Sequence, residues 1–242
     1  MPSLTLSDRL IWFAHCPKAG GTSVERMMVD LQGAAVGHLF WGWDLWWKGG
    51  GWRKADPPCS PQHLTWCDAR AALPRPPDAV FATVREPLAR MQSEHRWQAT
   101  RRRGTRAGRL LARLPFPLWL RLMLEIARIN PYAFDNHFRP QADFVPEGAV
   151  VFRLEDGLGP VAEWLAGQGA GRVAAPPHLL KGGSGTRSAD PASRALAARA
   201  FAADHARFGY PVPAGLPPAP RTGALLRRIA RGLAALERRG RL

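Results

Sequence analysis

The stretch LIWFAHCPKAGGTS, residues 10–23, decides the fold that this sequence predicts. Its first six residues are mostly apolar and form the short run typical of a buried strand, which ends at Pro17. Thr22 or Ser23 can then cap a helix that ends at Gly33. The apolar positions of this helix recur at helical spacing and are Val24, Met27, Met28 and Leu31. The stretch therefore predicts a strand, a glycine-containing loop and a helix.

The same order of elements returns further along the chain. Residues 79–84 (AVFATV) predict a second buried strand, and Pro87 stands where a helix through about Trp97 should begin. Residues 149–154 (AVVFRL) predict a third strand, and further helices are expected at 118–129, 159–166 and 191–208. Strands that alternate with helices predict an α/β fold of three layers, in which helices flank a central parallel sheet.

The length of 242 residues and the 46% of hydrophobic residues suit one domain with a buried core, which we place at residues 1–215. Residues 37–61 are expected to be an insertion, and its tryptophans are Trp41, Trp43, Trp46, Trp47 and Trp52. These rings either pack under the loop or stack on sugar rings. Residues 216–242 predict a basic amphipathic helix, either docked on the domain or attached to a membrane surface.

Charge and cysteine usage restrict the classes of partner and site. The net charge of +15 favours a polyanionic partner such as nucleic acid, an anionic membrane or a phosphate-bearing ligand. Cys16, Cys59 and Cys67 form no CxxC pair, which argues against a disulfide framework and a zinc site. No apolar run reaches the roughly 20 residues of a membrane-spanning helix, and the start lacks a signal-peptide pattern. We therefore expect a soluble, cytoplasmic protein.

The loop HCPKAGGTS, residues 15–23, has the composition of an anion site. A glycine loop between a strand and a helix presents backbone N–H groups and the positive end of the helix dipole to an anion. Lys18 adds an ammonium group, and the pair Gly20–Gly21 lets the backbone approach a phosphate closely. The hydroxyls of Thr22 and Ser23 can donate to its oxygens. Because the lysine precedes the glycines, the loop differs from a Walker A loop.

A second group of polar residues, VREPLARMQS, follows the second predicted strand. Arg85 ends that strand, while Arg90 and Ser93 lie one turn apart on the helix that Pro87 begins. An arginine fork with a serine hydroxyl suits a terminal phosphate dianion. Taken alone, the group is equally compatible with structural arginines.

Together the two motifs resemble those of the sulfotransferases that use 3′-phosphoadenosine 5′-phosphosulfate (PAPS). HCPKAGGTS resembles their 5′-phosphosulfate loop, and VREPLARMQS resembles their RxPxxRxxS motif for the 3′-phosphate. AVVFRLEDG is similar to a later strand of the family, which ends near an acidic residue. DHARFGYP resembles a C-terminal signature of the carbohydrate-type branch, sulfotransferase family 2, which includes the heparan and uronyl 2-O-sulfotransferases. The resemblance covers about residues 11–211.

The resemblance implies a P-loop-like fold and transfer of a sulfuryl group from PAPS to a hydroxyl of a carbohydrate or glycolipid, with no metal. Lys18 would neutralise charge on the bridging oxygen as its bond to sulfur breaks, and Lys181–Gly182 would form part of a loop over the 3′-phosphate. For Lys181–Gly182 the alternative is an ordinary flexible loop. The PAPS-binding residues implied in this way are Pro17, Lys18, Ala19, Gly20, Gly21, Thr22, Ser23, Arg85, Ser93, Lys181 and Gly182.

Such a reaction requires a general base for the acceptor hydroxyl, and histidine suits this role by its ordinary pKa. His63 lies 22 residues before Arg85, close to the place that the catalytic histidine of 2-O-sulfotransferases holds. His63 is therefore our first choice. His38 and His137 are the alternatives, and Glu25 is less suitable because it should lie inside the first helix.

Two other functions compete with this interpretation. A P-loop kinase or another nucleotide-phosphate enzyme would share the anion loop, but the position of the lysine and the lack of a suitable strand-end carboxylate argue against it. A basic nucleic-acid-binding protein would use the arginine runs at 101–113 and 221–241, but this leaves the two paired motifs unexplained.

Overall fold

A computed structural model of the chain describes residues 2–6, 8–33, 37–40, 59–72, 75–101, 106–171, 173 and 189–238. The chain divides into two units, and each has its own hydrophobic core. Unit 1 comprises Met1–Arg85 and Gln141–Gly182. Unit 2 comprises Glu86–Pro140 and Gly183–Leu242.

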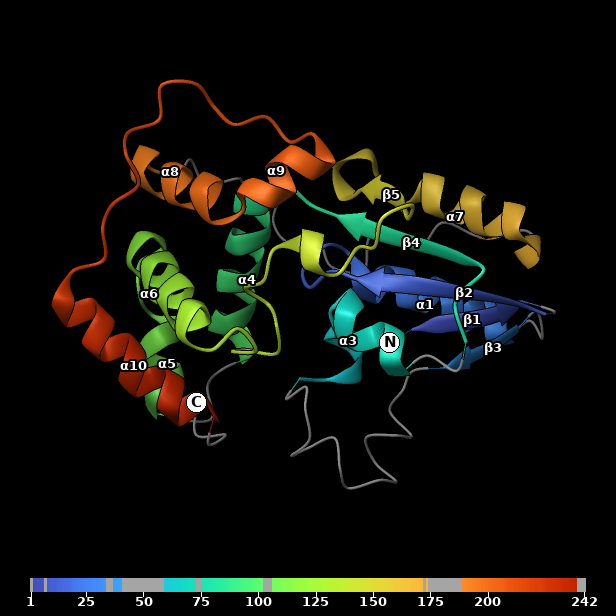
Figure 1. The fold of residues 1–242 in the computed structure, drawn as a ribbon, viewed down its shortest axis with the longest axis horizontal. Coiled ribbons are helices and arrows are strands. Elements are labelled where there is room, and N and C mark those ends of the chain that lie inside the picture. Colours follow the sequence, from blue (N-terminus) through green and yellow to red (C-terminus); the bar gives the residue numbers. More distant parts are fainter. Residues whose placement is uncertain are drawn as a thin grey trace. The chain divides into compact units, whose positions relative to one another are not determined.

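Unit 1 is built on a five-stranded mixed sheet with the strand order β3-β1-β2-β4-β5 (Figure 1). The strands are β1 (Ser3–Leu6), β2 (Arg9–His15), β3 (Gly37–Phe40), β4 (Ala79–Val84) and β5 (Val150–Arg153). β2, β4 and β5 run parallel to one another, whereas β1 is antiparallel to both of its neighbours. The carboxyl ends of the three parallel strands therefore meet at one edge, which is where open α/β sheets bind ligands.

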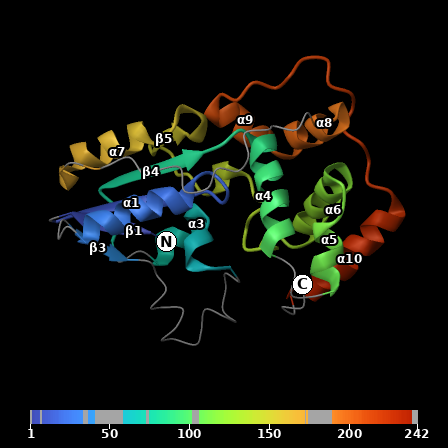
Figure 2. The ribbon, with the colours of Figure 1, turned by 180° about the vertical axis from the view of Figure 1, so that it is seen from behind.

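Side chains of unit 1 alternate between the two faces of the sheet. Ile11 and Phe13 point into a core that α1 (Gly21–Gly33) and α7 (Gly159–Leu165) complete on one face. Trp12 points the other way, and its ring contacts Trp66 at the start of α3 (Trp66–Ala72) with centroids 5.0 Å apart. Figure 2 shows α1 in front of the sheet, on the face that Figure 1 turns away from the viewer. Helices thus pack on both faces of this sheet.

Short helical turns complete the described part of unit 1. They are η1 (Pro61–His63), η2 (Gln141–Asp143), η3 (Leu154–Asp156) and η4 (Ala166–Ala170). η3 begins directly after β5 and therefore lies at the carboxyl edge of the parallel strands.

The regular structure described in unit 2 is helical. Its helices are α4 (Pro87–Arg101), α5 (Arg106–Ala112), α6 (Phe116–Ile129), α8 (Pro191–Ala200), α9 (Ala202–Phe208) and α10 (Ala224–Arg238). The core gathers around α6, whose Trp119 and Met123 are fully buried. α10 lies along α6 (Figure 1), and its Ala230 and Ala234 are fully buried because small side chains let two helices approach closely.

The predicted α/β class is confirmed, but the prediction of a parallel sheet is wrong, because β1 runs antiparallel to both β2 and β3. Only two residues separate Leu6 of β1 from Arg9 of β2, and so short a connection joins antiparallel strands. Residues 37–40, expected to begin an insertion, form β3 instead. The rest of the proposed insertion up to residue 58, with its five tryptophans, lies outside the described residues.

The other predicted elements are confirmed with shifts of a few residues. α1 begins at Gly21, just before the expected cap, and α4 continues past Trp97 to Arg101. The helix expected at 191–208 is divided at Phe201, whose φ of −116° and ψ of 34° are not helical. No helix in the described part of the chain combines the length and the apolar character that crossing a membrane requires.

Candidate functional site

The loop after β2 forms a concave backbone surface at the N-terminus of α1. Lys18 and Gly20 have positive φ angles of 66° and 88°, whereas Ala19 between them does not. Residues whose φ angles alternate in sign direct successive N–H groups to one side, a geometry that binds anions. In the described part of the chain, the N–H groups of Gly20, Gly21 and Thr22 donate to no backbone carbonyl. These three donors are therefore available to an anion at the positive end of the helix dipole.

The two glycines of this loop are required by close packing. A Cβ on Gly21 would lie 2.0 Å from Nε2 of His15, and a Cβ on Gly20 would lie 2.7 Å from Cδ1 of Leu154. Leu154 begins η3 directly after β5. The loop therefore packs against both its own strand and the end of β5. A Cβ on Gly21 would displace the buried His15 ring, whereas at Gly20 the positive φ angle disfavours a larger residue.

A buried histidine–glutamate pair supports the loop. Nδ1 of His15, at the end of β2, lies 2.7 Å from Oε1 of Glu25 in α1. Gln62 in η1 donates a hydrogen bond from Nε2 to the same oxygen. The ring of His63, the last residue of η1, meets the ring of His15 edge to face with centroids 4.9 Å apart. Side chains from β2, α1 and η1 thus form one polar cluster inside unit 1.

Glu25 carries a negative charge within this cluster. Burial alone would raise the pKa of its carboxyl group. The hydrogen bond and the charge of His15, the hydrogen bond from Gln62 and the charge of His63 outweigh this effect and hold the pKa below its ordinary value. The ionised carboxylate only accepts hydrogen bonds, so His15 donates from Nδ1. The orientation of the imidazole next to Gly21 is thereby fixed.

The end of β4 is held at the same edge of the sheet by Gln141. The N–H of Arg85 donates to Oε1 of Gln141, and Nε2 of Gln141 donates to the carbonyl of Arg85, both at 2.8 Å. The thiol of Cys16, directly after β2, lies 3.9 Å from the carbonyl of Gln141. The side-chain amide of Gln141 thus pairs with the backbone of Arg85 in the way that a neighbouring strand would. Lys18 comes after β2 and Arg85 comes after β4. Because these two strands are parallel neighbours, both residues lie at the same edge of the sheet of unit 1.

In unit 2, Arg90 of α4 has a structural role. Its guanidinium group is fully buried, and it donates to the carbonyls of His137 at 3.0 Å and Arg139 at 2.7 Å. These bonds hold the segment after α6 against α4. Ser93, one turn further along α4, is half-buried.

His137 in the same unit is held by a second buried carboxylate. Its Nδ1 lies 2.8 Å from Oε2 of Glu94, a fully buried residue of α4. Glu94 also accepts a hydrogen bond from Nε2 of Gln98 at 2.7 Å. A carboxylate on Nδ1 orients an imidazole and leaves Nε2 as the nitrogen that can accept a proton. Glu94 and His137 therefore have the arrangement of a general base and its orienting group.

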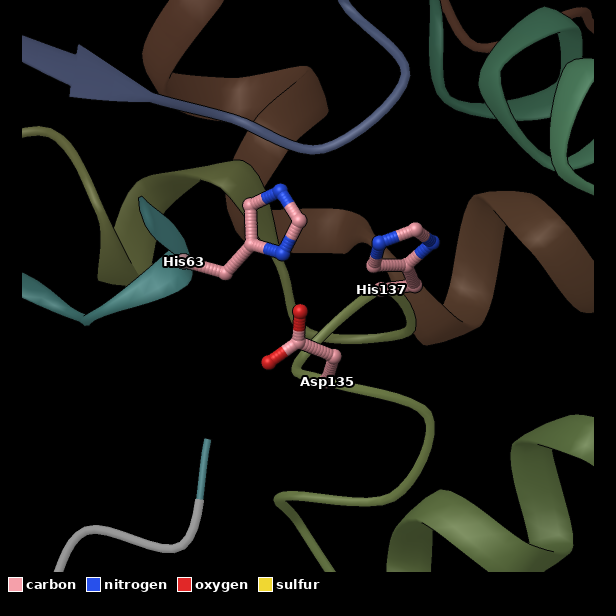
Figure 3. Close-up of side chains that lie close together, drawn as sticks. All are labelled: His63, Asp135 and His137. Atoms are coloured by element: carbon pink, nitrogen blue, oxygen red, sulfur yellow. The ribbon is translucent and has the colours of Figure 1, made fainter. Parts of the chain in front are cut away.

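The backbone before His137 is strained. Phe134, Asp135 and Asn136 have φ angles of 56°, 60° and 64°, a left-handed run that L-residues with side chains rarely adopt. The N–H of Phe134 is held by Glu237 of α10 at 2.9 Å, which helps to keep this turn in place. Figure 3 shows the side chains of His63, which comes from η1 of unit 1, and of Asp135 and His137, which come from this turn of unit 2.

The expected site residues that the structure describes lie in both units. Unit 1 brings the loop from Pro17 to Ser23, Arg85 and His63 into one region around the carboxyl ends of β2 and β4. Ser93 and His137 belong to unit 2. His38 lies in β3, and Lys181–Gly182 lies outside the described residues.

Sequence reasoning missed the polar partners of these residues. Glu25 lies inside α1 as expected, yet its bond to His15 was not anticipated. The sequence does indicate that this bond is possible. The last residue of a strand and the second turn of the helix after a tight loop lie close in space, and here these positions hold a histidine and a glutamate. No such signal marks Gln141, which is 56 residues from Arg85, or the pairing of Glu94 with His137.

Comparison of the chain with protein-family models, curated proteins and solved structures gave no significant match. The chemistry must therefore be inferred from the arrangement itself. The loop of unit 1 can bind a phosphate or sulfate group through three N–H donors and an ammonium group. The two carboxylate-supported histidines can accept or hold a proton.

Proposed function

We propose that the chain is a sulfotransferase that moves a sulfuryl group from PAPS to a hydroxyl of a carbohydrate or glycolipid. The observation that carries this proposal is the loop from Lys18 to Thr22, which has positive φ angles at Lys18 and Gly20 and leads into the N-terminus of α1. In the described part of the chain, the N–H groups of its Gly20, Gly21 and Thr22 donate to no backbone carbonyl. Arg85 ends the neighbouring parallel strand at the same edge. This arrangement agrees with the resemblance of both motifs to those of PAPS-dependent sulfotransferases.

The residues of unit 1 fit the phosphosulfate part of PAPS. The N–H groups of Gly20, Gly21 and Thr22 are not used by backbone hydrogen bonds in the described part of the chain, so they can donate to the oxygens of an anion. Arg85 supplies a guanidinium fork for a phosphate dianion, as the RxPxxRxxS resemblance implies. Both ends of the donor thus have candidate partners of the right charge.

In the proposed reaction, the acceptor oxygen forms a bond to sulfur while the bond between sulfur and the bridging phosphate oxygen breaks. Lys18 stabilises the negative charge that develops on that bridging oxygen, and the N–H donors hold the 5′-phosphate. The proton of the acceptor hydroxyl passes to a histidine. Positioning and electrostatic stabilisation therefore account for most of the catalysis, and the proposal assigns no role to a metal.

We assign the base to His63, which belongs to the same unit as the loop and lies in the cluster around the Glu25 carboxylate. His137 is the alternative, because Glu94 orients its ring as the partner of a general base should. His63→Ala should lower the turnover rate by about 10²–10⁴-fold with nearly unchanged PAPS binding. If His137→Ala alone has this effect in a folded protein, the base is His137.

The transfer of label from sulfur-labelled PAPS to a panel of glycans and glycolipids tests the activity. Lys18→Ala should depress kcat much more than PAPS affinity, because the lysine acts on charge that appears in the transition state. Arg96→Ala, which removes an exposed arginine of α4, is the control and should leave kcat unchanged. Absence of transfer to every acceptor, together with absence of PAPS binding, would refute the proposal.

A further inference from the structure

The outward side of α10 exposes apolar side chains although the helix is docked on α6. Its inner side is anchored by the fully buried Ala230 and Ala234. Leu225 and Ile229, one turn apart on another side, are 72% and 44% exposed. The exposed Gly232 and the half-buried Leu236 continue the same line at helical spacing, so no charged side chain interrupts this apolar stripe. The contact with α6 therefore uses only part of the apolar surface of α10.

A basic stripe lies beside this apolar one. Arg227, Arg228, Arg231 and Arg238 are all exposed, and none of them forms an ion pair within the described part of the chain. The one acidic residue of α10, Glu237, is turned to the protein, where it accepts hydrogen bonds from Asn130 and from the N–H of Phe134. Among the described residues, the outward surface of α10 is thus apolar and cationic, without an acidic side chain of its own.

We propose that the exposed side of α10 binds the surface of an anionic lipid bilayer, with the helix lying in the plane of the interface. Leu225 and Ile229 would enter the boundary between headgroups and acyl chains, while the arginines would contact lipid phosphates. Docking on α6 keeps the helix folded before it meets the membrane. This inference does not depend on the proposed sulfotransferase activity, although it fits an acceptor that is a glycolipid.

Nucleic acid is the competing polyanion, and the composition of α10 favours lipid. The helix, ALLRRIARGLAALER, contains no aromatic side chain on which bases could stack. Exposed Leu225 and Ile229 would gain nothing from a phosphate backbone, whereas a bilayer removes them from water. Phosphate contacts alone would use the arginines and leave the apolar stripe unexplained.

Flotation of the full-length protein with lipid vesicles tests the proposal. The protein should float with vesicles that contain phosphatidylglycerol, should remain behind with pure phosphatidylcholine, and should be released by high salt. Equal binding to both kinds of vesicle, or binding to neither, would overturn the proposal. A short DNA duplex that displaces the protein from vesicles while variants of the apolar stripe bind normally would assign the surface to nucleic acid instead.

Two double variants, each with its own control, test the apolar stripe and the basic stripe separately. The double variant Leu225→Glu, Ile229→Glu should reduce vesicle binding about tenfold or more, whereas Val212→Glu, at a 54% exposed valine outside α10, should not. Arg228→Glu with Arg231→Glu should have a similar effect, and Arg96→Glu on α4 serves as its control. Circular dichroism checks that α10 remains folded. Unchanged binding of folded stripe variants would overturn the proposal.

Discussion

Gly21 shows how a single missing side chain shapes the anion loop. In Gly21→Ala, the new Cβ would have to occupy space now held by the imidazole of His15. His15 cannot move freely, because Glu25 holds its Nδ1. We expect a loss of about 1–3 kcal/mol of unfolding free energy, as for other overpacked sites, and weaker binding of adenosine 3′,5′-bisphosphate. Denaturant unfolding and calorimetric titration measure the two effects.

Gly232→Ala is the matched control, because nothing lies within 4 Å of a Cβ at that position in α10. Alanine is a better helix former than glycine, so this variant should gain roughly 0.5–1 kcal/mol of unfolding free energy. Effects of the same sign in both variants would contradict the packing described beneath the loop.

The pKa of Glu25 predicts a pH-dependent contribution to stability. Burial opposes ionisation, but His15, Gln62 and His63 hold the pKa of the folded carboxyl below its ordinary value of 4.5. A carboxyl group of this kind stabilises the fold above its unfolded pKa, and the contribution is lost as the pH falls through its folded pKa. Glu25→Gln should therefore cost about 1 kcal/mol at pH 7, with the difference from the wild type disappearing in acid.

Denaturant unfolding of both proteins between pH 7 and pH 3 measures this difference. Asp30→Asn, which alters an exposed carboxylate of the same helix, is the control. A cost for Glu25→Gln that grows as the pH falls would contradict the assigned direction of the pKa shift.

At the level of elements, the N-cap of α8 offers a separate test. The carboxylate of Asp190 accepts hydrogen bonds from the N–H of Ser193 at 2.9 Å and from its hydroxyl at 2.6 Å. Asp190→Ala should lower the unfolding free energy by about 1 kcal/mol, whereas Asp190→Asn should keep most of the cap. Thermal unfolding measures both changes. Equal losses in the two variants would show that the charge of Asp190, rather than its capping geometry, is responsible.

The sequence predicted those elements that carry their own pattern. The apolar runs of β2 and β4 and the glycine loop between β2 and α1 were expected at their observed positions within one or two residues. β1 and β3 are four residues each, too short to show alternation, and their pairing is decided by long-range contacts. The long helix expected through Phe201 is divided there, at a residue whose backbone is not helical and whose side chain is buried in the core of unit 2.

The anion-binding loop of the candidate site could be predicted from the sequence. The buried polar residues that hold the site residues in place could not. Loop residues such as Lys18 and Gly20 can be predicted to bind an anion from their residue types and their order after a strand. Their supports, Gln141 and Glu94, are polar residues without a local motif, and folding alone brings them to Arg85 and His137. Burial of a polar side chain is set by tertiary packing, which a single sequence does not display.

At the scale of the whole molecule, we assign two roles to the excess of positive charge. The net charge is +15. Lys18 contributes to it in the anion loop, and the exposed arginines of α10 contribute to it on the surface. The first place suits a small phosphorylated donor, because N–H groups and a helix N-terminus define it. The second suits an extended anionic surface. The two can be tested independently, since variants of α10 leave the loop of unit 1 intact.

Calorimetric titration with adenosine 3′,5′-bisphosphate, adenosine 5′-monophosphate and ATP with magnesium decides whether the chain is built for PAPS. The bisphosphate should bind at least about tenfold more tightly than the monophosphate, because charge-assisted contacts to the 3′-phosphate contribute roughly 1.5–3 kcal/mol each. Arg85→Ala should abolish most of that preference, and chelation of magnesium should not change it. Equal affinity for the two adenosine phosphates, or tight binding of ATP that requires magnesium, would contradict the assignment.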